Sequence, residues 1–235
     1  HATFPKWLWR FKSDLCAPLI NTIMKGKIIY LSSAEASSFL LPRHYSGRKP
    51  NISKAFGLMH KGDLKCVLTF GKPASHTLCE GICGKENKHH VYELNRVCRL
   101  DDWDEPLSAF VAGCLRRVKS LNWIIVSYAD TAMNHCGYIY QACNFIYTGA
   151  TKKRTEQYTK GNKHSRHSKT IEQNGIRKVR SSKHRYVYFC TKKKHLLQEW
   201  KKSLNYSQQP YPKTINKNYD LGNFLQPELV DSTVK

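Results

Sequence analysis

The spacing of hydrophobic and polar residues predicts a chain in which strands and helices alternate. Short apolar runs predict strands at residues 26–31, 55–59, 65–70, 91–98 and 123–126. Helical spacing predicts helices at residues 33–41, 108–120 and from Tyr138 to about Phe145, the first of them capped by Ser32 or Ser33. Strand, helix, two strands, strand, helix, strand, helix is an order typical of an α/β protein.

The connections between these elements are predicted from turn residues. Residues 60–63 contain Gly62 and Asp63 and suit a hairpin turn, whereas residues 72–89, with proline, glycine and little periodicity, indicate a loop. After Val126 the apolar run gives way to Ser127, Tyr128 and Asp130, which predicts a polar loop at the end of a buried strand. Chemistry is often located there in open α/β folds. Alternatively, these polar residues only cap one another.

Two further segments carry candidate chemistry. The segment 41–50, between two prolines, brings together His44, Tyr45 and Arg48. A surface turn would explain its glycine and prolines but not this crowding of polar side chains, so we expect it to face an active site. Ser108 lies near a predicted helix start, where its hydroxyl and the backbone N–H groups could hold a phosphate. Helix capping explains Ser108 equally well.

Charge changes the picture, because 39 Lys and Arg residues against 17 Asp and Glu give a net charge of +22 over 235 residues. A polyanionic partner is expected. No apolar run approaches the roughly 18 residues of a membrane span, so nucleic acid is favoured over a membrane. Residues 150–204 hold 17 Lys or Arg against 3 Glu, which favours a DNA-embracing insertion at 151–182 over a merely solvated loop. The candidate DNA contacts are Arg48, Lys152, Lys153, Arg154, Lys163, Arg166, Lys183 and Arg185.

The nine cysteines are an odd number spread along the whole chain, which indicates a reducing cytoplasm rather than a disulfide framework. Cys79 and Cys83 have metal-like spacing, and His89 and His90 follow them. A structural zinc site usually shows two tight pairs of ligands, so zinc is not the favoured interpretation.

Six motifs in order resemble the bacteriophage Mom proteins over residues 26 to 213. They are segments 44–48, 92–96, 126–130, 135–142 and 183–189, together with Ser108 at a helix start. Mom proteins are GNAT-like enzymes that convert adenine in double-stranded DNA to N6-(carbamoylmethyl)adenine and so protect phage DNA from restriction. The resemblance implies this activity in the cytoplasm of a bacterial host. It also implies a GNAT (acetyltransferase)-like mixed sheet flanked by helices.

The resemblance implies a domain plan and a site. The plan is an N-terminal arm at 1–25, a catalytic core at 26–150, the basic insertion, and a final strand and helix with a tail at 183–235. The implied site residues are catalytic His44, Tyr45, Asp130, Tyr138 and Tyr140, with Arg96, Ser108 and Ser127 at the donor. Asp130 would take the N6 proton, and the tyrosines would supply stacking and hydroxyls.

Cofactor and donor are less defined. The resemblance implies iron with His44 as a ligand, and a second nitrogen ligand, for which His135 is a candidate, stays open. The two-carbon donor also stays open between acetyl-CoA and a glycine-derived group. The loop before Ser108 is acidic and lacks the glycine-rich CoA signature, so it should repel pyrophosphate. The rival functions are a CoA-dependent N-acetyltransferase acting on RNA or protein and a non-catalytic DNA-binding protein on the same scaffold.

Overall fold

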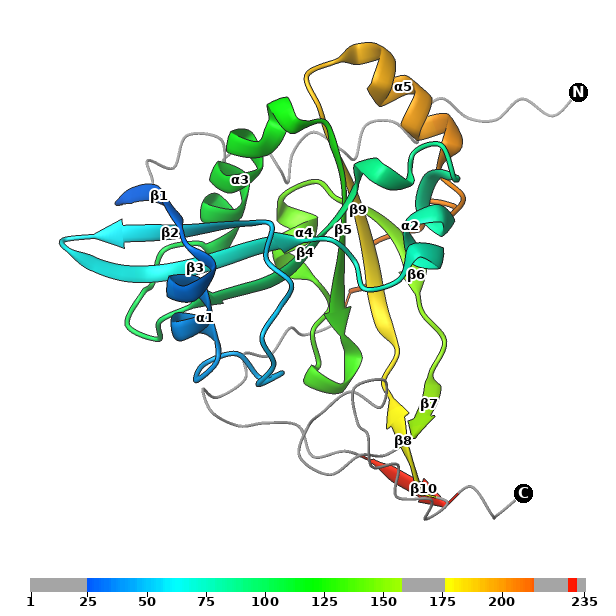
Figure 1. Cartoon of the computed structure of the whole chain (residues 1–235), viewed down its shortest axis with the longest axis horizontal. Coiled ribbons are helices and arrows are strands. Elements are labelled where there is room, and N and C mark those ends of the chain that lie inside the picture. The colour runs from blue at the N-terminus through cyan, green and yellow to red at the C-terminus, as the bar shows by residue number, and fades with distance from the viewer. Residues whose placement is uncertain (1–24, 158–175, 214–227, 232–235) are drawn as a thin grey trace, which may run out of the picture.

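A seven-stranded mixed sheet with helices on both faces forms the body of the protein (Figure 1). The computed structural model describes residues 25–157, 176–213 and 228–231. The strand order is β1-β2-β3-β4-β5-β9-β6. The strands are β1 (Lys27–Leu31), β2 (Lys54–His60), β3 (Asp63–Gly71), β4 (Val91–Arg99), β5 (Trp123–Asp130), β6 (Ile146–Ala150) and β9 (Lys183–Cys190).

Helices cover the sheet in two layers, and the predicted α/β sheet flanked by helices is confirmed. The helices are α1 (Ser33–Leu40), α2 (His76–Cys83), α3 (Leu107–Val118), α4 (Tyr138–Ala142) and α5 (Lys194–Ser203). One face packs Phe56 and Leu68 against Phe110 of α3. The other face carries two clusters, one under α1 and one in which α2 and Trp200 of α5 meet. No described helix is long and apolar enough to cross a membrane.

A second, three-stranded sheet continues the β6–β9 edge away from the body (Figure 1). It consists of β7 (Arg154–Gln157), β8 (Ile176–Arg180) and β10 (Leu229–Asp231), all antiparallel. The strands β7 and β8 are the two described ends of the predicted basic insertion. Residues 158–175, with Lys163 and Arg166, lie outside the described residues, as does the N-terminal arm up to residue 24.

The strands β4 and β5 form a parallel pair that soon parts. Their ladder is confined to Val91–Glu93 opposite Ile124–Val126. At the point where it ends, the Ser127 hydroxyl donates to the Leu94 carbonyl at 2.8 Å. Past this point β4 stays paired with β3 and β5 with β9, so the sheet opens into a wedge between β4 and β5.

A β-bulge in β4 decides which side chains face this wedge. The register with β3 runs from Phe70 opposite Leu94 to Thr69 opposite Arg96, so Asn95 is the extra residue. Leu94 and Val97 both contact the core under α3, although strict alternation would put them on opposite faces. Arg96 consequently lies on the face that α1 covers rather than beside Leu94.

Three sequence expectations are wrong, and the first concerns a connection. Residues 72–89 are not a plain loop, because they contain α2 and a 3-10 turn, η3 (Lys88–His90). The Ser75 hydroxyl accepts a hydrogen bond from the Leu78 N–H, and Cys79, Ile82 and Cys83 are buried against α5. Such a short helix with an internal glycine gives almost no periodic signal. Its stability comes from packing against residues more than a hundred positions later in the chain.

The second correction concerns the expected polar loop after Val126. Residues 127–130 belong to β5, which pairs with β9 from Trp123 to Asp130. The polarity of Ser127 and Asp130 suggested that the strand ends earlier. Both residues are nevertheless buried within it. Similarly, Ser108 is not an N-cap. Pro106 occupies that position, and no side chain caps α3.

Candidate active site

A cavity of about 190 Å³ opens in the wedge between β4 and β5. Five of the predicted site residues line it, and they come from segments far apart in the sequence. They are His44 and Tyr45 from the loop after α1, Arg96 from β4, and Tyr138 and Tyr140 from α4. His135 and Tyr128 line it as well. Segments up to 96 residues apart, from His44 to Tyr140, thus converge on one pocket.

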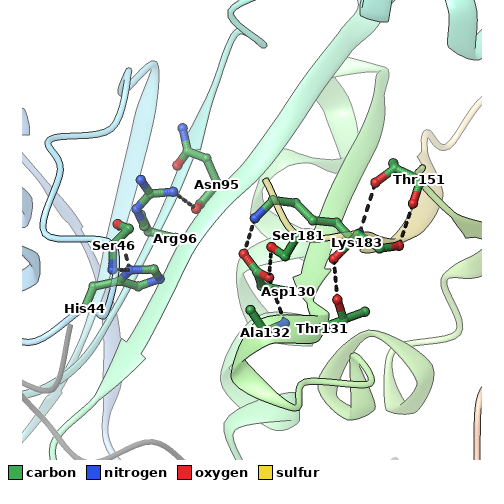
Figure 2. A network of polar contacts seen from close by, with 11 residues as sticks. His44, Ser46, Asn95, Arg96, Asp130, Thr131, Ala132, Thr151, Ser181 and Lys183 are labelled. Carbon is green, nitrogen blue, oxygen red and sulfur yellow. Dashed lines mark hydrogen bonds and ion pairs between the residues drawn. The ribbon is translucent and has the colours of Figure 1, made fainter. Parts of the chain in front are cut away.

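His44 is buried, and the adjacent backbone fixes its tautomer. The Ser46 backbone N–H donates to His44 Nδ1 at 3.2 Å, and the Ser46 hydroxyl lies 3.0 Å from the same atom (Figure 2). Since a backbone N–H can only donate, Nδ1 is an acceptor and a neutral ring carries its proton on Nε2. Burial, aided by the charges of Arg96, His135 and Lys183, lowers the pKa of His44 to about 3. At neutral pH His44 is therefore an uncharged hydrogen-bond donor through Nε2.

Tyr45 stacks on His44 and meets His135 edge-on. The ring centroids are 4.4 Å and 5.8 Å apart, respectively. Burial is the main reason that the pKa of Tyr45 is raised above its usual value, with a contribution from the charge of Asp130. Tyr45 is therefore protonated at neutral pH.

The described residues do not fit a complete iron site. They contain no group of three or more His, Cys, Asp and Glu side chains that could hold a metal ion. The pocket is lined by two imidazoles, four phenols, the Cys98 thiol and the Asp101 carboxylate, and the charges of Arg96 and Lys183 are near enough to lower the pKa of His44. Positive charge of this kind disfavours a bound cation. Iron stays a prediction, and we assign His44 no metal-bound role.

Tyr140 connects the pocket to the sheet. Its side chain is buried and hydrogen-bonded to Ser127, which in turn bridges β5 to β4 at the point where the wedge opens. Burial raises the pKa of Tyr140 to about 12, so its hydroxyl is also protonated at neutral pH. Ser127 does not line the cavity, and its contacts position Tyr140.

Tyr138 stands at the start of α4, and 65% of its surface is exposed. Gly137 before it has a φ of +78°, and an added Cβ would lie 2.3 Å from the Tyr186 ring. The Tyr186 hydroxyl donates to the Cys136 carbonyl, and the Gln141 side-chain amide donates to that carbonyl at 3.0 Å. The turn that presents Tyr138 is therefore tightly held, although Tyr138 itself is exposed.

Asp130 does not line the cavity; it lies beside it, at the end of β5. Its carboxylate forms an ion pair with Lys183, accepts a hydrogen bond from the Ser181 hydroxyl and accepts the Ala132 N–H at 3.1 Å (Figure 2). Burial alone would raise the pKa of Asp130, but the Lys183 charge and these hydrogen bonds hold it below its usual value. Asp130 is therefore a stable carboxylate, and its role as proton acceptor stays a prediction.

Glu93 is a functional candidate that the sequence analysis overlooked. It is the last β4 residue in the ladder with β5, at the closed end of the wedge. Burial raises its pKa, against the opposing charges of Arg96 and Lys183. In the sequence it is one glutamate inside a strand-like run. The one signal that could have identified it is that a glutamate is unusual in a central strand, which is mostly apolar.

The predicted DNA contacts fall into two groups. Lys152, Lys153 and Arg154 are exposed at the start of the second sheet. In contrast, the Arg185 guanidinium donates to Thr148 and lies 3.3 Å from the centre of the Tyr206 ring, and Lys183 pairs with Asp130. Arg48 is partly buried and near enough to Arg96 to lower its pKa. Only the first group is placed on the surface as expected for phosphate contacts.

The zinc interpretation finds no support among the described residues. Cys79 and Cys83 face the core, and the Cys83 thiol lies 3.7 Å from the Trp200 carbonyl. His90 Nδ1 instead contacts the Asn122 carbonyl at 2.9 Å. The thiols of Cys79 and Cys83 have pKa values raised by burial, as expected for packed cysteines.

The mixed sheet and its parting parallel strands, with the pocket between them, form a GNAT (acetyltransferase)-like fold. Among solved structures, an N-acetyltransferase from Staphylococcus aureus Mu50 is similar at 11% identity and a TM-score of 0.44, over 71% of this chain and 99% of that chain. The ribosomal-protein-S5-alanine acetyltransferase from Vibrio fischeri is similar at 9% identity and a TM-score of 0.42, over 72% and 95%. Scores this low carry over no substrate or cofactor.

The match to a family model is more specific evidence than the similarity in fold. The model of the Mom protein family matches residues 27–213. This chain therefore belongs to the Mom protein family, and the resemblance found in the sequence is confirmed. A comparison with curated protein sequences finds no match.

Proposed function

We propose that this chain is a transferase that converts adenine in double-stranded DNA to N6-(carbamoylmethyl)adenine and protects phage DNA from restriction in the bacterial cytoplasm. The observation that carries the proposal is the convergence of His44, Tyr45, Arg96 and Tyr140 on one cavity. A non-catalytic DNA-binding protein would have no need for it. Family membership supports the same reading.

The pocket is suited to a reacting group that develops negative charge. Neutral His44 donates through Nε2, and Tyr45 and Tyr140 keep their hydroxyl protons at neutral pH. Hydrogen-bond donors that are fixed before the reaction stabilise charge that develops in a transition state. The adenine would leave the helix stack to reach this pocket, because N6 is paired and stacked inside a duplex. The exposed ring of Tyr138 at the rim is placed to stack on a base.

The surface next to the pocket supports DNA as the partner. The second sheet extends from the β6–β9 edge. Its strand β7 begins with the exposed Arg154, and its strand β8 ends with the exposed Arg180. Lys152 and Lys153 precede β7 and are also exposed. Exposed Lys and Arg side chains on a projecting ribbon suit the phosphates of a duplex.

Mass spectrometry of nucleosides from cells that express the chain tests the function. We expect a deoxyadenosine heavier by about 57 mass units, the increment for replacing one N6 hydrogen by CH₂CONH₂ in a flipped base. Matched DNA from cells expressing the Tyr140→Phe variant, which loses a hydroxyl but little volume, should contain less of it. Unaltered deoxyadenosine alongside abundant folded protein would refute the proposal. An acetylated product on RNA or protein would favour the CoA-dependent rival.

A further inference from the structure

Arg96 brings a charged group into the pocket without a carboxylate in direct contact with it among the described residues. Its Nε is buried and has no hydrogen-bond partner among the described residues. Its Nη1 donates to the neighbouring Asn95 carbonyl at 2.6 Å. None of the ion pairs in the described part of the chain includes Arg96. A buried charged donor without a partner lowers the stability of a folded protein, so this arrangement needs a functional reason.

The β-bulge shows that this placement is specific. Without the extra residue Asn95, strand alternation would turn Arg96 away from the α1 face of the wedge, toward the core under α3. The nearest carboxyl group on its own strand, Glu93, forms no ion pair with it within 4 Å, and burial raises the pKa of Glu93. Because Nη1 donates to the Asn95 carbonyl, the Nε edge of the guanidinium is the part that can bind a ligand. Two parallel N–H groups on that side match the two oxygens of a carboxylate.

We propose that Arg96 binds the carboxylate of a small co-substrate of the proposed reaction, and that this site does not bind CoA. This rests on the function proposed above. A singly charged carboxylate suits the pocket better than a phosphate, because Asp101 also lines it and repels a doubly charged anion more strongly. The cavity of about 190 Å³ has room for a molecule of a few heavy atoms.

The region before α3 is unfavourable for CoA. Asp101, Asp102, Asp104 and Glu105 precede the helix, and its N-cap, Pro106, offers no side-chain hydrogen bond. Lys65 pairs with Asp102 and Lys25 with Glu105, and the ion pairs of the described residues include neither Asp101 nor Asp104. A pyrophosphate would meet these carboxylates at the helix end that otherwise attracts anions.

Thermal unfolding of the full chain without DNA tests the proposal. The probes are sodium acetate, inorganic phosphate and acetyl-CoA, each compared with sodium chloride at equal ionic strength, because any anion screens a chain of charge +22. We expect a saturable rise in melting temperature with acetate. In Arg96→Met the apparent affinity for acetate should fall about tenfold to a hundredfold, the range for losing a charged hydrogen bond.

Two variants keep the result interpretable. Arg99→Met removes a guanidinium from the same pocket wall, where it donates to the Glu105 carbonyl, and should leave the acetate effect intact. Arg96→Lys keeps the charge but not the paired N–H groups and should bind acetate more weakly than the wild type. Without ligand, Arg96→Met should melt at a higher temperature than the wild type, since it removes an unpaired buried charge, so loss of binding would not reflect misfolding.

Three outcomes would overturn the proposal. An Arg96-dependent effect of phosphate without one of acetate would assign Arg96 to a nucleotide phosphate. Tighter Arg96-dependent binding of acetyl-CoA than of acetate would show that this site binds CoA. An acetate effect equal in the wild type and Arg96→Met would be screening alone. Nucleoside mass spectrometry measures the proposed DNA modification independently of these unfolding experiments. Failure of carboxylate binding at Arg96 can therefore be distinguished from failure of the proposed function.

Discussion

The strand-end cluster of Asp130, Lys183 and Ser181 differs from Arg96 and Glu93 on the neighbouring strand β4 in how its buried charge is compensated. In the strand-end cluster the Asp130 carboxylate has an ion pair and two hydrogen bonds, and its pKa is lowered. On β4, Arg96 lines the pocket with a buried Nε that has no partner among the described residues, and burial raises the pKa of Glu93 on the same strand. A buried charge with an ion-pair partner stabilises the fold, whereas a buried charge without one is typical of ligand-binding and catalytic sites.

The largest expected effect is on activity. Asp130→Asn should reduce adenine modification by about a hundredfold or more, the scale for losing a proton acceptor or a charge that orients the site. It should also lower the free energy of unfolding by about 1–3 kcal/mol, because Lys183 loses its partner in a partly buried pair. Nucleoside mass spectrometry and urea unfolding give the two numbers. Normal modification by this variant would remove Asp130 from the mechanism.

A double variant separates pairing from chemistry. Asp130→Asn with Lys183→Met leaves neither charge unmatched, so about 1–2 kcal/mol of the stability lost in Asp130→Asn should return while activity stays low. The matched comparison is Arg96→Met, which should gain stability and lose activity. Strictly additive stability effects of Asp130→Asn and Lys183→Met would contradict the idea that the strand-end cluster is held by its pair.

Exposed charges give a third, intermediate effect. Replacing Lys152, Lys153 and Arg154 with Gln should weaken duplex binding about tenfold or more and reduce the salt slope by about one per lost phosphate contact. The matched control replaces Lys192, Lys193 and Lys194, also three exposed cations, before and at the start of α5. Fluorescence anisotropy at several salt concentrations measures both variants. Equal losses in the two would mean that binding follows net charge rather than the second sheet.

The smallest expected effect is a pair of opposite pH dependences. The folded pKa of Asp130 is lowered, so its contribution to stability is present above about pH 4 and is lost as pH falls further. The folded pKa of Glu93 is raised, so its contribution is present at low pH and is lost as pH rises above about 4.5. As pH rises from 3 to 7, Asp130→Asn should therefore become less stable than the wild type and Glu93→Gln more stable, because Asn and Gln both mimic the protonated carboxyl group. Two curves parallel to the wild type would show that neither carboxyl group is perturbed.

The sequence by itself determined the order of most strands and helices up to α4, the family and the segments that line the pocket. These depend on local periodicity, on turn residues such as Gly62, and on motifs that can be read in order along the chain. It also limited the N-cap of α1 to Ser32 or Ser33, and in the structure Ser32 and Glu35 form reciprocal hydrogen bonds there.

Only the tertiary structure decided which of these residues act together. The bulge at Asn95 turns Arg96 into the wedge, and a bulge depends on the partner strand β3 rather than on the local pattern. Asp130 meets Lys183 because β5 pairs with β9, 53 residues later, and this pairing also keeps polar residues inside the strand that the sequence alone ends at Val126. Burial and partner charges, which set whether a carboxyl group or an imidazole is ionised, arise only when distant segments pack together.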